Sequence, residues 1–472
     1  MIDSNAFRKY AHEFVDWMAD YLESVEALPV KSRAKPGEIY DRLPDEAPAK
    51  GEPFENIFED FKHIILPGMT HWQSPNYFAY FNANSSYPSV LAEMLTATIA
   101  AQCMVWETSP AAAELEEKVM NWLRDMIGLP SDFEGVIQDT ASTATLVAFL
   151  TAREKHSAYR INEEGFSTNE VFRIYCSAEA HSSIEKAVKM AGFGRKNLVK
   201  IETDKALAVK PDKLAEAIEK DRARGFIPLC VVAALGTTGT VAMDPIKQLC
   251  EICRKFNIWL HVDAAYSGTA LVLPEMRYLI EGIENVDSFV FNPHKWMFTN
   301  FDCSAYFVKD VAALIKTFEI LPEYLKTGTR GQVNDYRDWG IQLGRRFRAL
   351  KLWFVLRDYG VEGIQSKIRD HISWAKILAE EIRKEPEFTL YEPQHLGLVC
   401  FRYSPNSIKV KEELNAINTQ LMNTLNESGK IYLTHTKVND LVTLRMVIGQ
   451  TNMTLSHVMN AWKLVKETAA TF

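Results

Sequence analysis

Four short apolar runs set the strongest limit on what this chain can fold into. They span residues 172–177, 228–234, 258–263 and 288–291, and segments with helical character separate them. Short apolar strands that alternate with helices build a mostly parallel sheet with helices on both faces. We therefore predict an α/β fold in which this sheet forms the centre of a large domain.

Two of these runs lead directly to residues that can carry chemistry. Asp263 closes the run 258–263, and Lys295 lies shortly after the run 288–291. In parallel sheets ligands bind outside the carboxyl ends of the strands, so both side chains should reach one crevice. A surface turn would explain Lys295 alone, and a helix cap would explain Asp263 alone. Together they favour pyridoxal phosphate, which needs a lysine for its aldehyde and an acid facing its ring nitrogen.

At these residues the chain resembles a known family. The sequence HVDAAY at 261–266, followed by NPHKW at 292–296, is similar to the group II pyridoxal-dependent decarboxylases, specifically the aromatic-L-amino-acid decarboxylases. The resemblance extends over nearly the whole chain. It implies fold type I, the aspartate-aminotransferase architecture, with a small α+β C-terminal domain. It also implies pyridoxal 5'-phosphate as cofactor and the conversion of an aromatic L-amino acid, of the tyrosine, DOPA, tryptophan or 5-hydroxytryptophan type, to its amine and CO2.

The resemblance further implies roles for individual residues. In the catalytic set, Lys295 and Asp263 are joined by His181, which stacks on the cofactor ring, and by Tyr324, which donates a proton. The other cofactor-binding residues are Ala141, Ser142, Thr238, Ala265, Asn292 and His294. The substrate-binding residues are Trp72, Tyr80, Phe81, Ala83, Met104, Arg337 and Gly344.

Simpler explanations remain open for several of these segments. The small hydroxylated residues at 140–145 precede an apolar helix, where they form either an anion site or an ordinary helix cap. The densely aromatic stretch 71–82 packs in a core or lines a pocket for a flat ring. The polar, glycine-containing segment 322–332 predicts a mobile loop or lid, in which Tyr324 is either a packing anchor or the proton donor.

Two positions bear on the choice of substrate. Ala83 stands where relatives often carry a hydroxyl residue, so no side-chain hydrogen bond to a ring hydroxyl is expected. Gly344 stands where relatives vary a small residue, and glycine leaves room for an indole. We expect a broad preference among aromatic rings and no acidic substrate.

The N-terminal part predicts an association between two copies. Apolar residues at helical spacing from Phe7 to Leu22 form an amphipathic helix, and prolines keep residues 28–53 extended. Such a helix docks on another subunit or on its own body. The resemblance implies a homodimer in which the segment around Met104 reaches the partner's pocket. The expected domains are a helical dimerisation segment at 1–85, a large cofactor-binding domain at 86–370 and a small domain at 371–472, with strands at 396–402, 431–434 and 442–448.

Bulk properties argue against other classes of protein. The net charge of −8 includes no basic stripe, so nucleic acid is not an expected partner. The polar N-terminus lacks the apolar core of a signal peptide, and no apolar window is long enough to span a membrane. The seven cysteines lie mostly in apolar runs, which favours reduced thiols in the cytoplasm. Cys250 and Cys253 are expected to be core residues, and no metal site is expected.

Three other functions fit parts of the pattern. A transaminase normally fixes the substrate carboxylate with an arginine in the ring plane, and the matched motifs argue against it. An oxidative deaminase that makes an aldehyde fits everything except Tyr324, which such relatives replace. A non-catalytic protein with the same fold is disfavoured by the intact Lys295 and Asp263.

Overall fold

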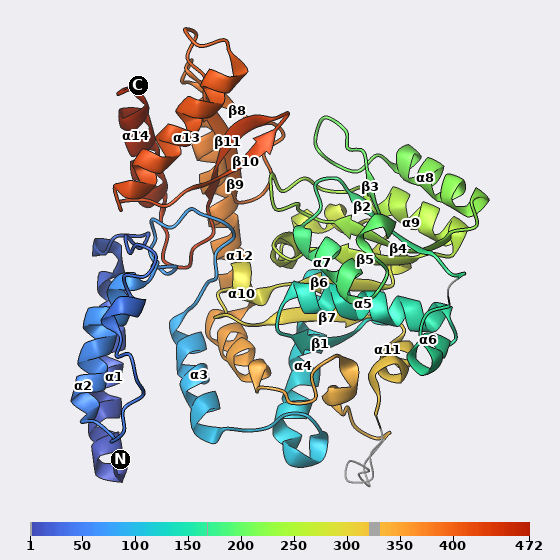
Figure 1. Cartoon of the computed structure of the whole chain (residues 1–472), viewed down its shortest axis with the longest axis horizontal. Coiled ribbons are helices and arrows are strands. Elements are labelled where there is room, and N and C mark those ends of the chain that lie inside the picture. Colours follow the sequence, from blue (N-terminus) through green and yellow to red (C-terminus); the bar gives the residue numbers. More distant parts are fainter. Residues whose placement is uncertain (1, 168, 321–330) are drawn as a thin grey trace. The chain divides into compact units, whose positions relative to one another are not determined.

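The computed structural model describes residues 2–167, 169–320 and 331–472 (Figure 1). They form two compact units. Unit 1 comprises Met1–Asn82, Trp374–Tyr391 and Val399–Phe472, and unit 2 comprises Ala83–Ser373 and Glu392–Leu398. Over the described ranges, no helix combines the length and the apolar character needed to cross a membrane.

Unit 2 is built on a seven-stranded sheet with the strand order β1-β7-β6-β5-β4-β2-β3. Only β7 runs antiparallel to its neighbours β1 and β6, so the predicted mostly parallel sheet is confirmed. Ala234, Asp263 and Val290 lie side by side in β4, β5 and β6. The strands are β1 (Glu134–Gln138), β2 (Phe172–Ser177), β3 (Leu198–Ile201), β4 (Ile227–Ala234), β5 (Trp259–Asp263), β6 (Ser288–Phe291) and β7 (Ser304–Val308).

Helices pack against both faces of this sheet. Alternate residues of a strand point to opposite faces. Ile174 and Cys176 of β2 therefore join the buried residues of α5 and α7 in one core cluster. Tyr175 points the other way and donates from its hydroxyl to Asp221 of α8 at 3.0 Å. The helices of unit 2 up to β7 are α3 (Tyr87–Ile99), α4 (Pro110–Ile127), α5 (Ala141–His156), α6 (Arg160–Glu164), α7 (Ser182–Met190), α8 (Pro211–Ala223), α9 (Ile246–Phe256) and α10 (Pro293–Trp296).

The backbone of α12 (Arg348–Arg383) leaves the helical conformation at Gly360, with φ 63° and ψ 170°. A glycine reaches these angles without a Cβ clash, which explains the break there. Cys250 and Cys253 lie buried on α9 as free thiols, as expected for core residues. Helix α11 (Val311–Phe318) follows β7.

Unit 1 contains a four-stranded antiparallel sheet with the order β10-β11-β9-β8. The prediction of a strand at 431–434 is wrong in its bounds. Tyr432 makes only an isolated bridge with Tyr77 and accepts from the N–H of Phe78, and the regular strand begins at Thr434. The elements are α1 (Ser4–Ser24), α2 (Phe54–Asp60), β8 (Phe388–Leu390), β9 (Leu398–Tyr403), α13 (Lys411–Glu427), β10 (Thr434–Val438), β11 (Leu441–Val447) and α14 (Leu455–Ala469).

Candidate active site

Lys295 lies on the short helix α10, which begins directly after β6 and Asn292. Its main-chain N–H donates to the Asn292 carbonyl at 2.9 Å, so the turn is tightly wound. Burial lowers the pKa of the Lys295 ammonium, and the negative charge of Asp263 opposes this shift. A lysine that loses its proton more easily than usual is suited to bond covalently to an aldehyde.

Asp263 is the last residue of the neighbouring strand β5, where it pairs with Val290 of β6. Its Oδ1 accepts from the main-chain N–H of Ala265 at 3.1 Å. Two further main-chain bonds join the strand ends, from Ala264 to the Val290 carbonyl at 2.9 Å and from Asn292 to the Ala265 carbonyl at 3.0 Å. These main-chain bonds hold the end of β5 against the turn that carries Lys295, and the shared crevice of the two side chains stays a prediction.

His181 caps the start of α7 and belongs to the same group of charges. Its Nδ1 faces the N–H of Ser183 at 3.2 Å and the hydroxyl of the same residue at 2.8 Å. Burial lowers the pKa of His181, Asp263 raises it and Lys295 lowers it, so the ring interacts with both site residues. When Nδ1 accepts, a neutral ring carries its proton on Nε2. The residue as a whole is exposed to solvent, so its ring is accessible for stacking.

The N-terminus of α5 offers free hydrogen-bond donors. Its cap residue, Thr140, accepts from Thr143 through its hydroxyl and from Ala144 through its carbonyl. Over the part of the chain that the structure describes, the N–H groups of Ala141 and Ser142 have no acceptor. Two unsatisfied N–H groups at the positive end of a 16-residue helix are suited to bind an anion.

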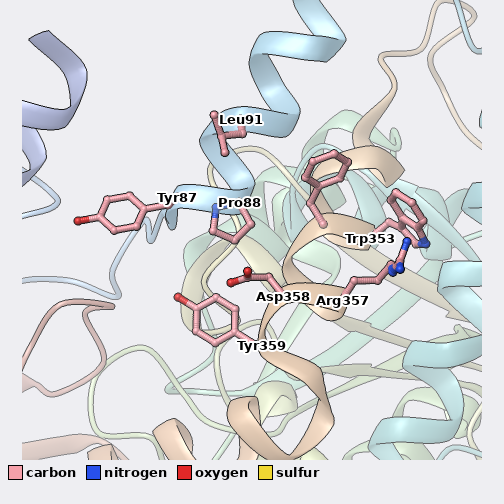
Figure 2. Close-up of a pocket in the computed structure, with 8 residues that line it drawn as sticks. Tyr87, Pro88, Leu91, Trp353, Arg357, Asp358 and Tyr359 are labelled. Atoms are coloured by element: carbon pink, nitrogen blue, oxygen red, sulfur yellow. The ribbon is translucent and has the colours of Figure 1, made fainter. Parts of the chain in front are cut away.

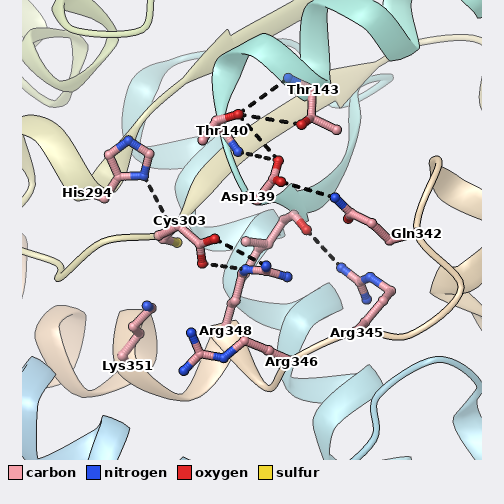
Figure 3. Close-up of polar contacts among 12 residues, drawn as sticks. Asp139, Thr140, Thr143, His294, Cys303, Gln342, Arg345, Arg346, Arg348 and Lys351 are labelled. Atoms are coloured by element: carbon pink, nitrogen blue, oxygen red, sulfur yellow. Dashed lines mark hydrogen bonds and ion pairs between the residues drawn. The ribbon is translucent and has the colours of Figure 1, made fainter. Parts of the chain in front are cut away.

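His294 and Asn292 add two further donors beside Lys295. His294 Nδ1 accepts from the N–H of Cys303 at 2.8 Å (Figure 3). Burial, assisted by the charge of Lys295, lowers the pKa of His294 to about 3, so the ring is neutral at physiological pH. Its proton then sits on Nε2, which can donate to an anion. Asn292 Oδ1 accepts from the hydroxyl of Ser304 at 2.7 Å, which leaves the amide nitrogen as a donor.

Asn84 is a residue of this site that no sequence motif indicates. Its amide donates to the Lys295 carbonyl at 2.5 Å, and its main-chain N–H donates to the His294 carbonyl at 3.1 Å. Ala83, a predicted substrate residue, therefore lies next to the lysine-bearing turn. A single asparagine 211 positions away from its partner has no periodicity or motif that could reveal the contact.

Three predicted substrate residues lie in unit 1, in an aromatic cluster. Trp72 stacks with Tyr77 at a centroid distance of 4.6 Å and with Tyr80 at 6.1 Å. Tyr80 is half exposed, with φ 51°, and Phe81 is buried with the Arg445 guanidinium 5.3 Å from its ring centroid. Trp72 and Tyr77 thus pack in the cluster while Tyr80 stays half exposed, and a pocket for a flat ring at this stretch stays a prediction.

Three others lie together in unit 2. The Met104 carbonyl accepts from the N–H of Arg337 at 2.9 Å. The guanidinium of Arg337 is buried, and in the described ranges it has no hydrogen bond, although Asp338 Oδ1 lies 3.4 Å from its Nε. A Cβ on Gly344 would meet Gln102 Nε2 at 3.0 Å. The segments 102–104 and 337–345 therefore pack against each other.

The remaining predicted residues are placed as follows. Thr238 is exposed on the turn that follows β4, and Ala265 is partly buried beside Asp263. Tyr324 lies outside the described residues. The groove drawn in Figure 2 has a volume of about 510 Å³ and is lined by none of the predicted site residues. Its lining residues are Tyr87, Pro88, Leu91, Trp353, Phe354, Arg357, Asp358 and Tyr359.

The residues around Lys295 fit pyridoxal phosphate. Lys295, an amine of lowered pKa, follows the strand next to the one that ends in the Asp263 carboxylate. The imidazole of His181 interacts with both charges. The N–H groups of Ala141 and Ser142, which have no acceptor in the described ranges, can bind an anion. These features define the class of protein as a pyridoxal-phosphate enzyme of fold type I.

Comparison with known proteins narrows the class to a family. The chain belongs to the pyridoxal-dependent decarboxylases, since the model "Pyridoxal-dependent decarboxylase conserved domain" matches residues 36–404. It is 40% identical to a tyrosine decarboxylase of Papaver somniferum and 39% identical to a phenylacetaldehyde synthase of Petunia hybrida, over 99% of this chain and 95% of each relative. The crystal structure of Catharanthus roseus tryptophan decarboxylase in complex with L-tryptophan is similar with a TM-score of 0.94 and 38% identity, covering 100% of this chain and 99% of that one.

Proposed function

We propose that this chain decarboxylates aromatic L-amino acids to the corresponding amines and CO2. The observation that carries the proposal is the pairing of Lys295 with Asp263 across adjacent strand ends, in a chain of the pyridoxal-dependent decarboxylase family. Relatives named for tyrosine and for tryptophan support an aromatic substrate.

Each residue of the site then has a defined task. Lys295 binds the cofactor aldehyde, Asp263 keeps the ring nitrogen protonated, and His181 stacks on the ring. Pyridoxal phosphate supplies the electron sink that accepts the electron pair of the bond to the departing carboxylate. The phosphate is held by the N–H groups of Ala141 and Ser142 and by the side chains of Asn292 and His294, while Thr238 and Ala265 complete the cofactor contacts.

The substrate ring is bound by aromatic and small residues. Trp72, Tyr80 and Phe81 provide the flat apolar surface, and Ala83 provides no hydrogen bond to a ring hydroxyl. Met104, Arg337 and Gly344 are the other proposed substrate-binding residues. This set favours phenol and indole rings over acidic side chains.

Tyr324 is the proposed donor of the proton that replaces the carboxylate. Slow protonation would favour oxidation to an aldehyde, the activity named for one relative, the phenylacetaldehyde synthase. The presence of Tyr324 favours the amine as the product.

We propose a homodimer for two structural reasons. Helix α1 has aromatic contacts with α2, yet none of its 21 residues is buried, and Phe7 remains 60% exposed. Helix α3 exposes a row of apolar residues beside the groove of Figure 2, namely Tyr87, Leu91, Leu95 and Ile99. Burying these faces against a second copy would remove apolar area from water. In the proposed division, residues 1–85 supply the dimerisation segment, 86–370 the cofactor-binding domain and 371–472 the small domain.

The dimer can be tested by subunit mixing. Gly344 contacts Gln102 in the segment that is expected to reach the partner's pocket. Two variants are therefore mixed. One carries Lys295→Ala and keeps Gly344, and the other carries Gly344→Ser and keeps Lys295. The mixed dimer should keep the substrate preference of the unsubstituted protein, because the working Lys295 faces the intact Gly344 of its partner. A preference equal to that of the Gly344→Ser homodimer would contradict the arrangement, and a monomer with full activity would refute the dimer.

We also propose a cytoplasmic location. All seven cysteines are buried free thiols, and burial raises the pKa of Cys176 and Cys400 to about 12. Such thiols are inert while the protein is folded. An aromatic disulfide reagent should react with none of them before denaturation and with all seven afterwards.

The function is tested by product analysis. The purified protein is loaded with pyridoxal phosphate and offered tyrosine, DOPA, tryptophan, 5-hydroxytryptophan, phenylalanine and glutamate. The expected result is CO2 and amine from the aromatic substrates, with neither product from the Lys295→Ala control. Efficient turnover of glutamate, or no turnover of any aromatic amino acid, would overturn the proposal.

A further inference from the structure

A carboxylate lies at the helix end that the proposed function gives to the cofactor phosphate. Asp139 follows β1 and precedes Thr140, the cap residue of α5. Its Oδ1 accepts from the main-chain N–H of Thr140 at 2.6 Å, and its Oδ2 accepts from Gln342 Nε2 at 3.1 Å (Figure 3). The next two N–H groups, of Ala141 and Ser142, have no acceptor in the described ranges. A carboxylate and a phosphate would therefore share one helix end.

The two anions would lie close enough to repel each other measurably. Consecutive main-chain nitrogens are less than about 4 Å apart, so Asp139 Oδ1 lies within about 7 Å of the nitrogen of Ala141. The N-terminus of a helix carries only about half a positive charge, which does not neutralise both anions. A phosphate oxygen that accepts from this N–H lies about 3 Å beyond the nitrogen, so the two charges lie within about 10 Å of each other. With a dielectric constant of about 20, repulsion between unit charges at that distance changes a dissociation constant roughly tenfold.

The cations near this helix end are already paired. Figure 3 shows a row of basic residues on the segment that follows Gln342. Each of them pairs with another carboxylate: Arg345 with Glu116 at 2.6 Å, Arg348 with Asp302 at 2.8 Å, and Arg346 and Lys351 with the same residue, Glu93, at 2.5 Å and 2.7 Å. The charge of Asp139 also acts on Arg348, but the side-chain hydrogen bond of Asp139 Oδ2 goes to Gln342, which is neutral.

We propose that Asp139 sets the affinity of this chain for its cofactor. Its charge opposes the phosphate, so pyridoxal phosphate is held less tightly than a neutral residue of the same shape would allow. This inference rests on the proposed placement of the phosphate at Ala141 and Ser142. If Asp139 weakens binding, the fraction of protein that holds pyridoxal phosphate should change with the cofactor concentration. A protein that binds the cofactor more tightly would stay saturated over the same range of concentrations.

The test is equilibrium binding to the apoprotein of Asp139→Asn. The amide keeps an oxygen for the Thr140 N–H, and Gln342 can rotate its own amide to accept from the new donor, so both local bonds survive. The dissociation constant for pyridoxal phosphate, followed by visible absorbance, should fall about tenfold. Pyridoxal, which lacks the phosphate, should bind both proteins equally. Asp139→Glu retains the charge and should keep the affinity of the unsubstituted protein within about threefold.

A matched control removes a carboxylate elsewhere in the same unit. Asp132 lies shortly before β1, is largely exposed and pairs with Lys309 at 3.1 Å. Asp132→Asn changes the net charge by the same amount and should leave the dissociation constant for pyridoxal phosphate unchanged. If the dissociation constant of this control fell as much as that of Asp139→Asn, net charge alone would explain the effect, and the proposal would be overturned.

Other outcomes also decide the matter. Unchanged or weaker binding of pyridoxal phosphate by a normally folded Asp139→Asn protein overturns the proposal, and so does equal tightening for pyridoxal. If Asp139→Asn lowers the melting temperature of the apoprotein, Asp139→Ser keeps an acceptor for Thr140 and provides the same comparison. Failure of the proposed function looks different, because the unsubstituted protein would then develop no visible band with pyridoxal phosphate at all.

Discussion

Replacing Asn84 with alanine should loosen the turn that carries Lys295. The substitution removes the amide that donates to the Lys295 carbonyl at 2.5 Å and leaves the main-chain bond to the His294 carbonyl in place. Asn84 is 1% exposed, so water cannot readily take over the lost contact. Removing one partner of a hydrogen bond in such a water-poor setting costs about 1–3 kcal/mol. We therefore expect the free energy of unfolding of unit 2 to fall by about that amount.

The assay follows both stability and the lysine. Urea unfolding gives the stability of Asn84→Ala, and absorbance titration gives its affinity for pyridoxal phosphate. If the lost free energy destabilises the protein with bound cofactor, this affinity should weaken by roughly 5- to 100-fold. Asn285 provides the matched control. It is exposed and its amide donates to the Gly282 carbonyl at 3.4 Å, so Asn285→Ala should change stability by less than about 0.5 kcal/mol.

Two results would separate the possible roles of Asn84. Unchanged stability and unchanged cofactor affinity in Asn84→Ala would refute the reasoning that this amide holds the turn. Lower stability with unchanged affinity would make the contact structural and leave the position of Lys295 to the strand ends alone.

Three other perturbations address the substrate, the product and the pH range. Gly344→Ser should penalise tryptophan more than tyrosine, with a difference of about 1–3 kcal/mol, because its Cβ would meet Gln102 Nε2 at 3.0 Å; equal losses of kcat/KM would contradict this. Tyr324→Phe should still release CO2 but form less amine and, in air, more aldehyde, ammonia and peroxide; normal amine formation without oxygen uptake would assign the proton donor elsewhere. Burial lowers the pKa of His261 to about 4 and that of His294 to about 3, from 6.5, so the unfolded chain binds protons that the folded chain does not. Their contribution to stability is complete above about pH 6.5 and is lost as the pH falls towards 3. The urea midpoint should therefore decrease as the pH falls below 6.5, and His261→Asn should make this decrease less steep. An unchanged dependence of the midpoint on pH would exclude His261 as a cause.

The strands that carry the chemistry could be predicted because burial on both faces leaves a clear signal. A central strand of a parallel sheet is a continuous apolar run, and β6 has the predicted bounds 288–291 while β5 lacks only Ile258 of its predicted run. Once two such strands are neighbours, their carboxyl ends must meet. The proximity of Asp263 and Lys295 follows from this topology, without knowledge of any side-chain contact.

The residues that support the site could not be predicted in the same way. Asn84 acts through one amide on a main-chain carbonyl that is distant in sequence, and only the folded backbone brings the two together. The same limit explains the error at 431–434. An apolar run does not reveal which partner a backbone will choose, and Tyr432 bonds to the segment around Phe78 before the regular strand begins.

Gly344 shows that a small residue in the sequence is not the same as empty space in the structure. The sequence predicts room for an indole at this position because glycine has no side chain. In the fold the space that a Cβ would enter is bordered by Gln102 Nε2, and Gln102 Oε1 accepts from the N–H of Arg345 at 2.8 Å. Arg345 is itself held by its buried ion pair with Glu116. If Gly344 lines the substrate pocket as proposed, the size of the ring that can be admitted would depend on how far the Gln102 amide can move, and its bond to the Arg345 main chain limits that movement. Specificity at this position would then be set by the contact between two segments, 102–104 and 337–345, and not by the glycine alone.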